Sequence, residues 1–561
     1  AAREMEENNG KAVLAAINEV LIDRVFSSSV TLSARGVVSF IEQLIAVSDA
    51  EISGDTKKGI SGVSSTSTSA TKGKVTGSAH GPEGPRIFSL QHLVEVADYN
   101  MNIRPRITWS QIWETMGNHF AKVGCNENAM VSMFAIDALR QLSFKFLEKP
   151  ELTDFNFQRL FLKPFLLIMK NPGSREDIRE LVLRCVDNII RTLAHNLQSG
   201  WKIFFSILTL SSSDPSVKIN TLGLAILQRL LDEHLDELCL SGPLTVDGEG
   251  KTDGTFSSSA RSIRNSNAED FVELCRASLS FVQIEESDTP LPIGLSMRAL
   301  CHTACYADLI ADKKVLPPVS GYQHSDRMAP GFTYEGLTVE ESLEMTLWRP
   351  LLDGLSSGMC STAPSISGGV GCLIQRGSVM ALRAILLRHG KLFSVAQWSA
   401  ILTYAILPAV QVGAESDTSP VTSILSESPS VSSLDFVGEP LRFPPPRDDE
   451  GLLKFAAVLQ ADEVTPCRPL GTAELLAEAS FADLRHGGDG NLSNAFSLKK
   501  KDVDTRISNL QPFPNSWIAT TAPIALGLLT DIVYSNFLSL GAGGRDVLWP
   551  AISSQLARWS V

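Results

Sequence analysis

The clearest structural signal in the chain is the stretch Thr108–Phe120, TWSQIWETMGNHF. Its large apolar side chains recur every three or four residues, which places them on one face of an α-helix. The same spacing returns in Val131–Phe146 and in Ile178–Leu193, and we expect Ser174, with Asp177 three residues later, to form a capping box before the third helix. The apolar positions of the three stripes are Trp109, Ile112, Trp113, Met116 and Phe120; Val131, Phe134, Ala135, Ala138, Leu139, Leu142 and Phe146; and Ile178, Leu181, Val182, Cys185, Val186, Ile189 and Leu193.

Three helices begin in a similar way, at Asn128–Leu139, Asp177–Val186 and Asp214–Ala225. Each opens with a polar turn and then places small apolar residues at helical spacing. Counted between their first apolar residues, successive copies lie 47 and 39 residues apart, which is typical of HEAT-type repeats. Runs that alternate in the manner of β-strands are scarce. The sequence therefore predicts an all-α protein, an α-solenoid of HEAT/armadillo-like helical repeats.

Passages rich in Ser, Gly and Pro divide the chain. They lack large apolar residues, so burial cannot offset the entropy lost on ordering them. We expect helical regions at 1–52, 86–240 (a first HEAT-like domain), 268–313 (a helical repeat), 337–412 (helical repeats) and 447–561 (a C-terminal helical region with an internal loop near 486–514). Between them we expect a disordered insert at 53–85 and linkers at 241–267, 314–336 and 413–446.

Composition narrows the class of protein. The 561 residues carry 49 Lys and Arg against 62 Asp and Glu, a formal net charge of −13. Nucleic-acid surfaces need clustered cations to neutralise phosphates, so this balance argues against a nucleic-acid partner. No apolar run reaches the roughly 18 residues that a membrane-spanning helix needs. The chain begins with Ala1 rather than Met, and we expect it to be part of a longer protein.

Patterns that would indicate reaction chemistry are scarce. The nine scattered cysteines are interpreted as reduced thiols. Cys301 and Cys305 lack a second Cys/His pair at a useful spacing, so we interpret them as core thiols rather than zinc ligands. His119 lies close to Cys125 and to Gly124, which predicts a turn between helices rather than a nucleophile with its base. The sequence thus predicts no catalytic residue, no metal site and no cofactor.

Several segments between Pro85 and Lys202 together resemble a known family. They are PRIFSLQ (85–91), YNM (99–101), WSQIW (109–113), GNHFAKVGCN (117–126), DALRQLS (137–143), KFLEK (145–149) and SGWK (199–202). This set resembles the region downstream of the catalytic domain in large Arf guanine nucleotide-exchange factors of the brefeldin A-inhibited, trans-Golgi type. Leu32–Val47 and Arg376–Pro408 are similar to other parts of the same family, more loosely.

The resemblance implies a function without catalysis. The family's exchange loop carries a Phe-Arg-Leu-Pro-Gly-Glu-Ala-like signature, and the chain contains no such segment. The implied identity is a C-terminal regulatory region that is cytoplasmic and peripherally associated with Golgi and trans-Golgi membranes. Its implied partner is a GTP-loaded Arf-family small GTPase, and a homodimer is left open. Because the net charge is −13, we expect a partner protein rather than anionic lipid to dominate recruitment.

Basic residues on a polar helix face are the candidates for contact with that partner: Arg140, Lys145 and Lys149. An alternative from another class is a free-standing HEAT-repeat adaptor or transport scaffold unrelated to nucleotide exchange. A third class, an all-α enzyme, would need a convergent set of polar residues, and the sequence offers none.

Overall fold

The computed structural model describes residues 19–53, 87–148, 151, 156–234, 258–282, 293–319, 337–360 and 370–407, together with single positions elsewhere. Helices and short turns make up these residues, and no β-strand occurs among them. The predicted all-α helical repeat fold is therefore confirmed. The chain divides into two compact units, Ala1–Ile207 and Leu208–Val561.

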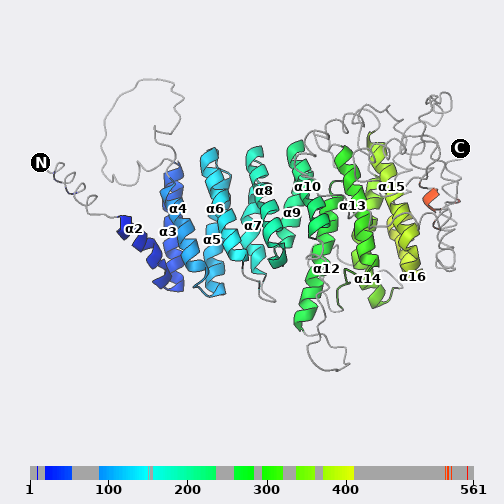
Figure 1. Ribbon diagram of the computed structural model, residues 1–561, viewed down its shortest axis with the longest axis horizontal. Helices are drawn as coiled ribbons and strands as arrows, with labels where there is room; N and C mark the ends of the chain where they lie inside the picture. Colours follow the sequence, from blue (N-terminus) through cyan, green and yellow to red (C-terminus); the bar gives the residue numbers. More distant parts are fainter. Residues whose placement is uncertain are drawn as a thin grey trace, which may run out of the picture. The chain divides into compact units, whose positions relative to one another are not determined.

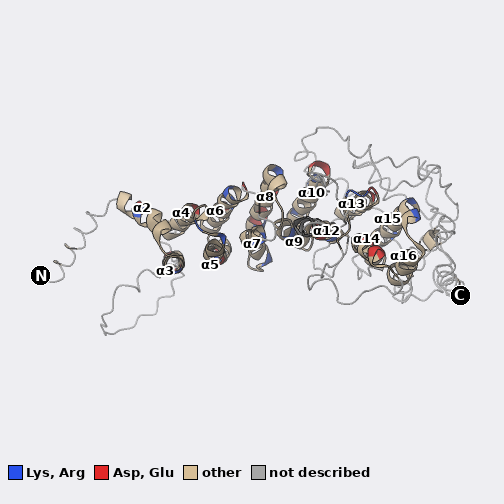
Figure 2. Ribbon diagram, turned by 90° about the horizontal axis from the view of Figure 1, so that it is seen from below, with Lys and Arg blue, Asp and Glu red and all other residues tan. Residues whose placement is uncertain are grey.

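The first unit is made of helices that alternate between two layers. These are α2 (Glu19–Ser27), α3 (Ala34–Ser53), α4 (Phe88–Met101), α5 (Arg106–Gly124), α6 (Ala129–Leu147), α7 (Phe157–Lys170), α8 (Glu176–Leu193) and the beginning of α9 (Trp201–Ser212). One layer holds α3, α5 and α7 side by side, and the other holds α4, α6 and α8 (Figures 1 and 2). From α3 to α8, each helix also packs against the next one along the chain, which is the stacking expected of helical repeats.

The predicted apolar stripe of α5 faces the core of this unit. All five of its members are buried: Trp109, Ile112, Trp113, Met116 and Phe120. The ring of Trp113 stacks on Phe161 of α7 with centroids 3.9 Å apart. As predicted, α5 ends at Gly124, where a Cβ would lie only 2.7 Å from Cδ1 of Ile168. The absence of a side chain at this glycine therefore allows α7 to approach the end of α5.

The second unit repeats the two-layer plan. It contains α10 (Val217–Glu233), α12 (Ser258–Leu279), α13 (Ile293–Ala311), α14 (Val339–Cys360), α15 (Val370–His389) and α16 (Val395–Ala400). Within it, α12 packs on α14 and α13 packs on α15. Large buried side chains form its core, including Phe271, Tyr306 and Trp398. The hydroxyl groups of Ser278 and Tyr306 form a hydrogen bond of 2.6 Å between α12 and α13.

The structure changes one predicted boundary. The linker predicted at 241–267 ends too late, because α12 begins at Ser258. Extending an existing helix costs far less than starting one, so a helix that is anchored by buried Phe271 and Cys275 can continue into a polar, serine-rich segment. The unit boundary falls inside α9, and so inside the predicted domain 86–240.

Other predicted segments lie almost wholly outside the described residues. These are the insert 53–85, the linker 413–446, the C-terminal region 447–561 and most of the linker 314–336. Ser53, the first residue of the predicted insert, is the last residue of α3.

Candidate functional site

Two of the three residues predicted to contact a partner, Arg140 and Lys145, lie on α6. Arg140 forms an ion pair of 2.7 Å with Asp137 on the same helix. Lys145 forms one of 2.8 Å with Asp98 on α4, while its side chain stays 54% exposed. The third predicted residue, Lys149, lies outside the described residues. Each of the two described cations thus already has a carboxylate partner.

Arg140 and Lys145 do not share one face of α6. They are five positions apart, which corresponds to a rotation of about 140° around an α-helix. Arg140 lies over the ring of Phe144, 5.9 Å from its centroid. Lys145 instead turns toward α4, and its ion pair with Asp98 links α6 to α4. The structure therefore does not gather the predicted residues into a single cationic patch.

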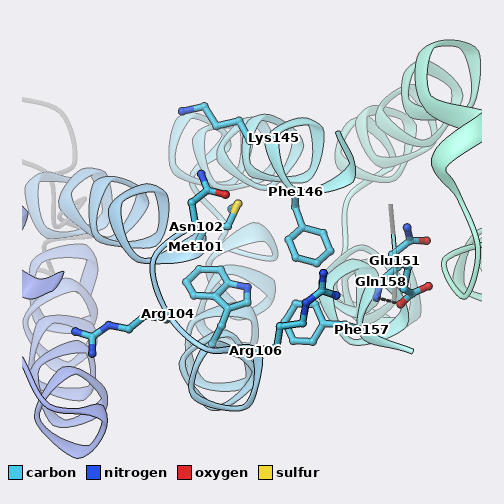
Figure 3. A pocket seen from close by; sticks show the side chains of 10 residues that line it. Met101, Asn102, Arg104, Arg106, Lys145, Phe146, Glu151, Phe157 and Gln158 are labelled. Carbon is cyan, nitrogen blue, oxygen red and sulfur yellow. Dashed lines mark hydrogen bonds between the residues drawn. The ribbon is translucent and has the colours of Figure 1, made fainter. Parts of the chain in front are cut away.

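A pocket lies beside Lys145 and is a better-formed candidate. Its volume is about 190 Å³. We call it the Arg106 pocket, and its walls come from the end of α4, the turn into α5, the end of α6 and the start of α7 (Figure 3). Its lining residues are Met101, Asn102, Arg104, Arg106, Trp109, Lys145, Phe146, Glu151, Phe157 and Gln158.

The apolar wall of the Arg106 pocket belongs to a larger aromatic cluster. Phe146 packs against Phe157 with ring centroids 5.1 Å apart, and it stacks on Phe161 at 4.2 Å. Trp113 continues the stack from Phe161 and lies 6.0 Å from Trp109. Three helices contribute to this cluster, so the pocket has a rigid floor set by packing of the repeat core.

Two charged residues of the Arg106 pocket serve the fold. The Arg104 guanidinium donates to Oδ1 of Asn100 at 2.9 Å, to the carbonyl oxygen of Leu32 at 2.7 Å and to that of Ser29 at 2.8 Å. Glu151 accepts hydrogen bonds from the backbone N–H of Gln158 and from Ser199, at 2.7 and 2.9 Å. Their polar atoms are therefore occupied by neighbouring turns.

Two other lining residues have polar groups that lack a hydrogen-bond or ion-pair partner among the described residues. Within the described part of the chain, the Arg106 guanidinium makes neither an ion pair nor a hydrogen bond. Trp109 is only 2% exposed, and its indole Nε1 donates to no acceptor. A buried donor without an acceptor costs about 1–3 kcal/mol, so such groups call for an explanation.

Sequence reasoning missed this pocket. It assigned Trp109 to the core, which is correct for the ring but leaves its N–H unexplained. The signal that could have indicated the pocket is the run Arg104-Pro105-Arg106, which places two cations around a proline just before a helix. A cation at the first residue of a helix is unfavourable to the helix dipole.

His119 occupies a different position from the predicted one. It lies in the middle of α5 rather than in a turn, because the helix continues to Gly124. Its ring is buried against α3, where Nε2 lies 3.1 Å from Oγ of Ser48 and Nδ1 lies 3.6 Å from Asp49. Burial lowers the pKa of His119 from 6.5 to about 4, although Asp49 acts in the opposite direction. His119 is thus a neutral hydrogen-bonding residue between two helices.

The thiols are placed much as predicted. Cys185 is buried in α8, and burial raises its pKa to about 12. Cys305 is buried in α13, while the thiol of the half-buried Cys301 donates to the carbonyl oxygen of Met297 within that helix.

In the described part of the chain, His, Cys, Asp and Glu side chains nowhere gather in a group that could hold a metal ion. None of the described helices is both long and apolar enough to cross a bilayer.

Comparison with known proteins shows what the chain is similar to. Residues 145–229 match the family described as Mon2/Sec7/BIG1-like, HDS. Brefeldin A-inhibited guanine nucleotide-exchange protein 4 of Arabidopsis thaliana is 29% identical over 416 residues, which cover 74% of this chain and 20% of that protein. Brefeldin A-inhibited guanine nucleotide-exchange protein 1 of Homo sapiens is 42% identical over 200 residues, which cover 36% of this chain and 9% of that protein.

The chain thus spans a fifth or less of the length of these relatives. Together the matches confirm the resemblance drawn from the sequence: the chain is similar to a region of guanine nucleotide-exchange proteins of the brefeldin A-inhibited type.

Proposed function

We propose that the chain is a non-catalytic regulatory region of an Arf guanine nucleotide-exchange protein, and that it recruits its parent protein to Golgi membranes by binding a GTP-loaded Arf-family GTPase. The observation that carries this proposal is the similarity to exchange proteins of the brefeldin A-inhibited type over most of the chain. The sequence contains no Phe-Arg-Leu-Pro-Gly-Glu-Ala-like exchange loop, which supports a role other than catalysis.

The helical repeat fold supports a binding role. Stacked helix pairs expose long surfaces that suit protein partners. In the first unit, α6 carries the ion-paired Arg140 on one face and the ion-paired Lys145 on another, and Lys145 lines the Arg106 pocket. The net charge of −13 disfavours attraction to anionic lipid, so the membrane contact is assigned to a lipid-anchored protein rather than to the bilayer.

A sedimentation experiment tests the recruitment role. The full chain is mixed with liposomes that carry GTP-loaded Arf, GDP-loaded Arf or no protein. We expect co-sedimentation with the first liposomes at least tenfold above the other two. Equal co-sedimentation with bare liposomes would contradict a protein-dependent mechanism, and no co-sedimentation with any of the three would contradict recruitment by Arf.

Charge-reversal variants then test the candidate surface. The double change Arg140→Glu, Lys145→Glu should reduce binding to the GTP-loaded liposomes. Arg184→Glu on α8 is a matched control, because Arg184 is an exposed arginine that is paired with Glu180 one turn away. The catalytic half of the proposal is tested by release of a fluorescent nucleotide from Arf, which micromolar chain should not accelerate. An acceleration of tenfold or more would contradict the non-catalytic role.

A further inference from the structure

The Arg106 pocket combines an apolar floor with unused hydrogen-bond donors. We propose that it receives the carboxylate of an Asp or Glu side chain, flanked by an apolar residue, from a partner protein. This inference rests on the proposed function in taking a protein as the partner, and it names the chemistry by which that partner is recognised.

The donors identify the ligand as an acceptor. The indole N–H of Trp109 and the guanidinium of Arg106 both belong to residues that line the pocket, and neither has a partner among the described residues. In contrast, Trp113, one turn further along α5, donates its indole N–H to the carbonyl oxygen of Phe161 at 3.1 Å. The same helix therefore satisfies one indole internally and leaves the other without an acceptor among the described residues.

The charge of the pocket favours a monoanion. Of its three cations, Arg104 is engaged by three oxygen acceptors and Lys145 by Asp98, and its one carboxylate, Glu151, accepts hydrogen bonds from Gln158 and Ser199. Figure 3 shows the side chains of Arg104 and Lys145 extending away from the middle of the group, whereas the Arg106 guanidinium points toward Phe146 and Phe157. One free guanidinium matches a carboxylate, which can accept two parallel hydrogen bonds from it. A phosphorylated side chain would bring a charge of about −1.5 to −2, for which the site holds too few free cations.

The surroundings favour a protein over a small metabolite. Whole small molecules occupy pockets of about 300–1,000 Å³, whereas this pocket measures about 190 Å³ and suits a side chain. Ile103 and Ile107 alternate with the pocket residues along the chain and are 64% and 71% exposed. Apolar side chains that are this exposed beside a cationic pocket are suited to cover by the residues that flank the bound carboxylate.

Capped dipeptides provide a direct probe. The probe is acetyl-Phe-Glu-amide, and its neutral isostere acetyl-Phe-Gln-amide differs only in the carboxylate. The full chain is labelled with ¹⁵N-tryptophan, and the indole N–H signal of Trp109 is assigned as the one lost in Trp109→Phe. Titration of this signal reports binding at the pocket. Trp201→Phe is the matched control, because the Trp201 indole is likewise buried without an acceptor but does not line the pocket.

We expect the Glu dipeptide to shift the Trp109 signal with a millimolar dissociation constant, at least tenfold tighter than the Gln dipeptide. Arg106→Gln should remove this preference, whereas Lys170→Gln, at the exposed end of α7, should keep it. A circular dichroism melt checks that Arg106→Gln remains folded, which we expect because the change removes a cation from a helix N-terminus.

Three results would overturn the inference. The first is equal binding of the Glu and Gln dipeptides. The second is tighter binding of a dipeptide in which phosphoserine replaces the Glu. The third is a Trp109 signal that does not move even when the Glu dipeptide is added at 50 times the expected millimolar dissociation constant. None of these results depends on Arf or on liposomes. Failure here with successful Arf-dependent sedimentation would refute the pocket assignment alone, and the reverse outcome would refute the proposed function alone.

Discussion

Trp113 and Phe161 are joined in two ways: their rings stack with centroids 3.9 Å apart, and the indole N–H of Trp113 donates to the carbonyl oxygen of Phe161 at 3.1 Å. The contact connects α5 to α7, which are successive helices of the same layer. Both side chains are almost completely buried. This pair is therefore a main link between neighbouring repeats of the first unit.

Substitutions at Trp113 should separate its two contributions. Trp113→Ala removes the ring and leaves a cavity, so we expect it to destabilise the α5–α7 region by about 3–5 kcal/mol. Trp113→Phe keeps an aromatic ring but loses the hydrogen bond, for which we expect about 1–2 kcal/mol. Hydrogen–deuterium exchange of peptides from α5 and α7 gives these local free energies. An equal cost for the two variants would show that the hydrogen bond, rather than the packing, dominates.

The helices were predictable because their signal is local. The three-and-four spacing of the α5 stripe depends only on nearby residues, and the structure buries all five of its members. The pairing of Lys145 with Asp98 was not predictable, because it depends on how α6 settles against α4, 47 residues away in sequence. The Arg106 pocket has the same origin, since four helices must be in place before its walls meet.

The Lys145–Asp98 ion pair should contribute little to stability. Its side chains are 54% and 37% exposed, and exposed ion pairs typically give about 0.2–1 kcal/mol. A double-mutant cycle with Lys145→Ala and Asp98→Ala should yield a coupling free energy in this range. The coupling should fall further in 0.5 M salt, because salt screens exposed charges. A coupling well above 1 kcal/mol would mean that the pair orders α6 against α4.

Helix capping offers a matched pair of substitutions. The predicted capping box at Ser174 is wrong, because α8 begins at Glu176 and the Ser174 hydroxyl has no hydrogen-bond partner. The N-cap residue is instead Arg175, whose side chain makes no capping hydrogen bond. It binds the carboxylate of Asp177 at 2.6 Å and holds the pKa of that carboxyl below its ordinary value. In contrast, Oδ1 of Asn128 accepts the backbone N–H of Met130 at 2.9 Å and caps α6.

Asn128→Ala should therefore cost about 0.5–2 kcal/mol, the usual loss for a removed N-cap. Ser174→Ala should change the stability by less than about 0.5 kcal/mol, because no hydrogen bond is lost. Local exchange rates in the first turns of α6 and α8 measure the two effects. A larger cost for Ser174→Ala than for Asn128→Ala would restore the capping role of the serine.

His119 makes the contact between α3 and α5 sensitive to acid. Its ring is buried, with Ser48 as the hydrogen-bond partner and Asp49 and Lys122 as the charged neighbours. Because the pKa of His119 falls from 6.5 to about 4 on folding, the unfolded chain binds a proton that the folded chain does not between these values. The stability gained by keeping His119 neutral is thus complete above pH 6.5 and is lost as the pH falls toward 4.

Over this window we expect the free energy of unfolding to fall by about 3 kcal/mol because of His119 alone. His119→Gln retains a hydrogen-bonding group for Ser48 but cannot be protonated, so it should lose this part of the pH dependence. Urea unfolding, followed by tryptophan fluorescence at pH 7, 5.5 and 4.5, compares this variant with the unaltered chain and with His195→Gln, which replaces an exposed histidine. The carboxyl groups of the chain are the same in all three proteins. Only the difference between the pH profiles of the His119→Gln variant and the other two proteins is therefore assigned to His119. Parallel pH profiles for the His119→Gln variant and the unaltered chain would show that the buried ring is not the source of acid sensitivity.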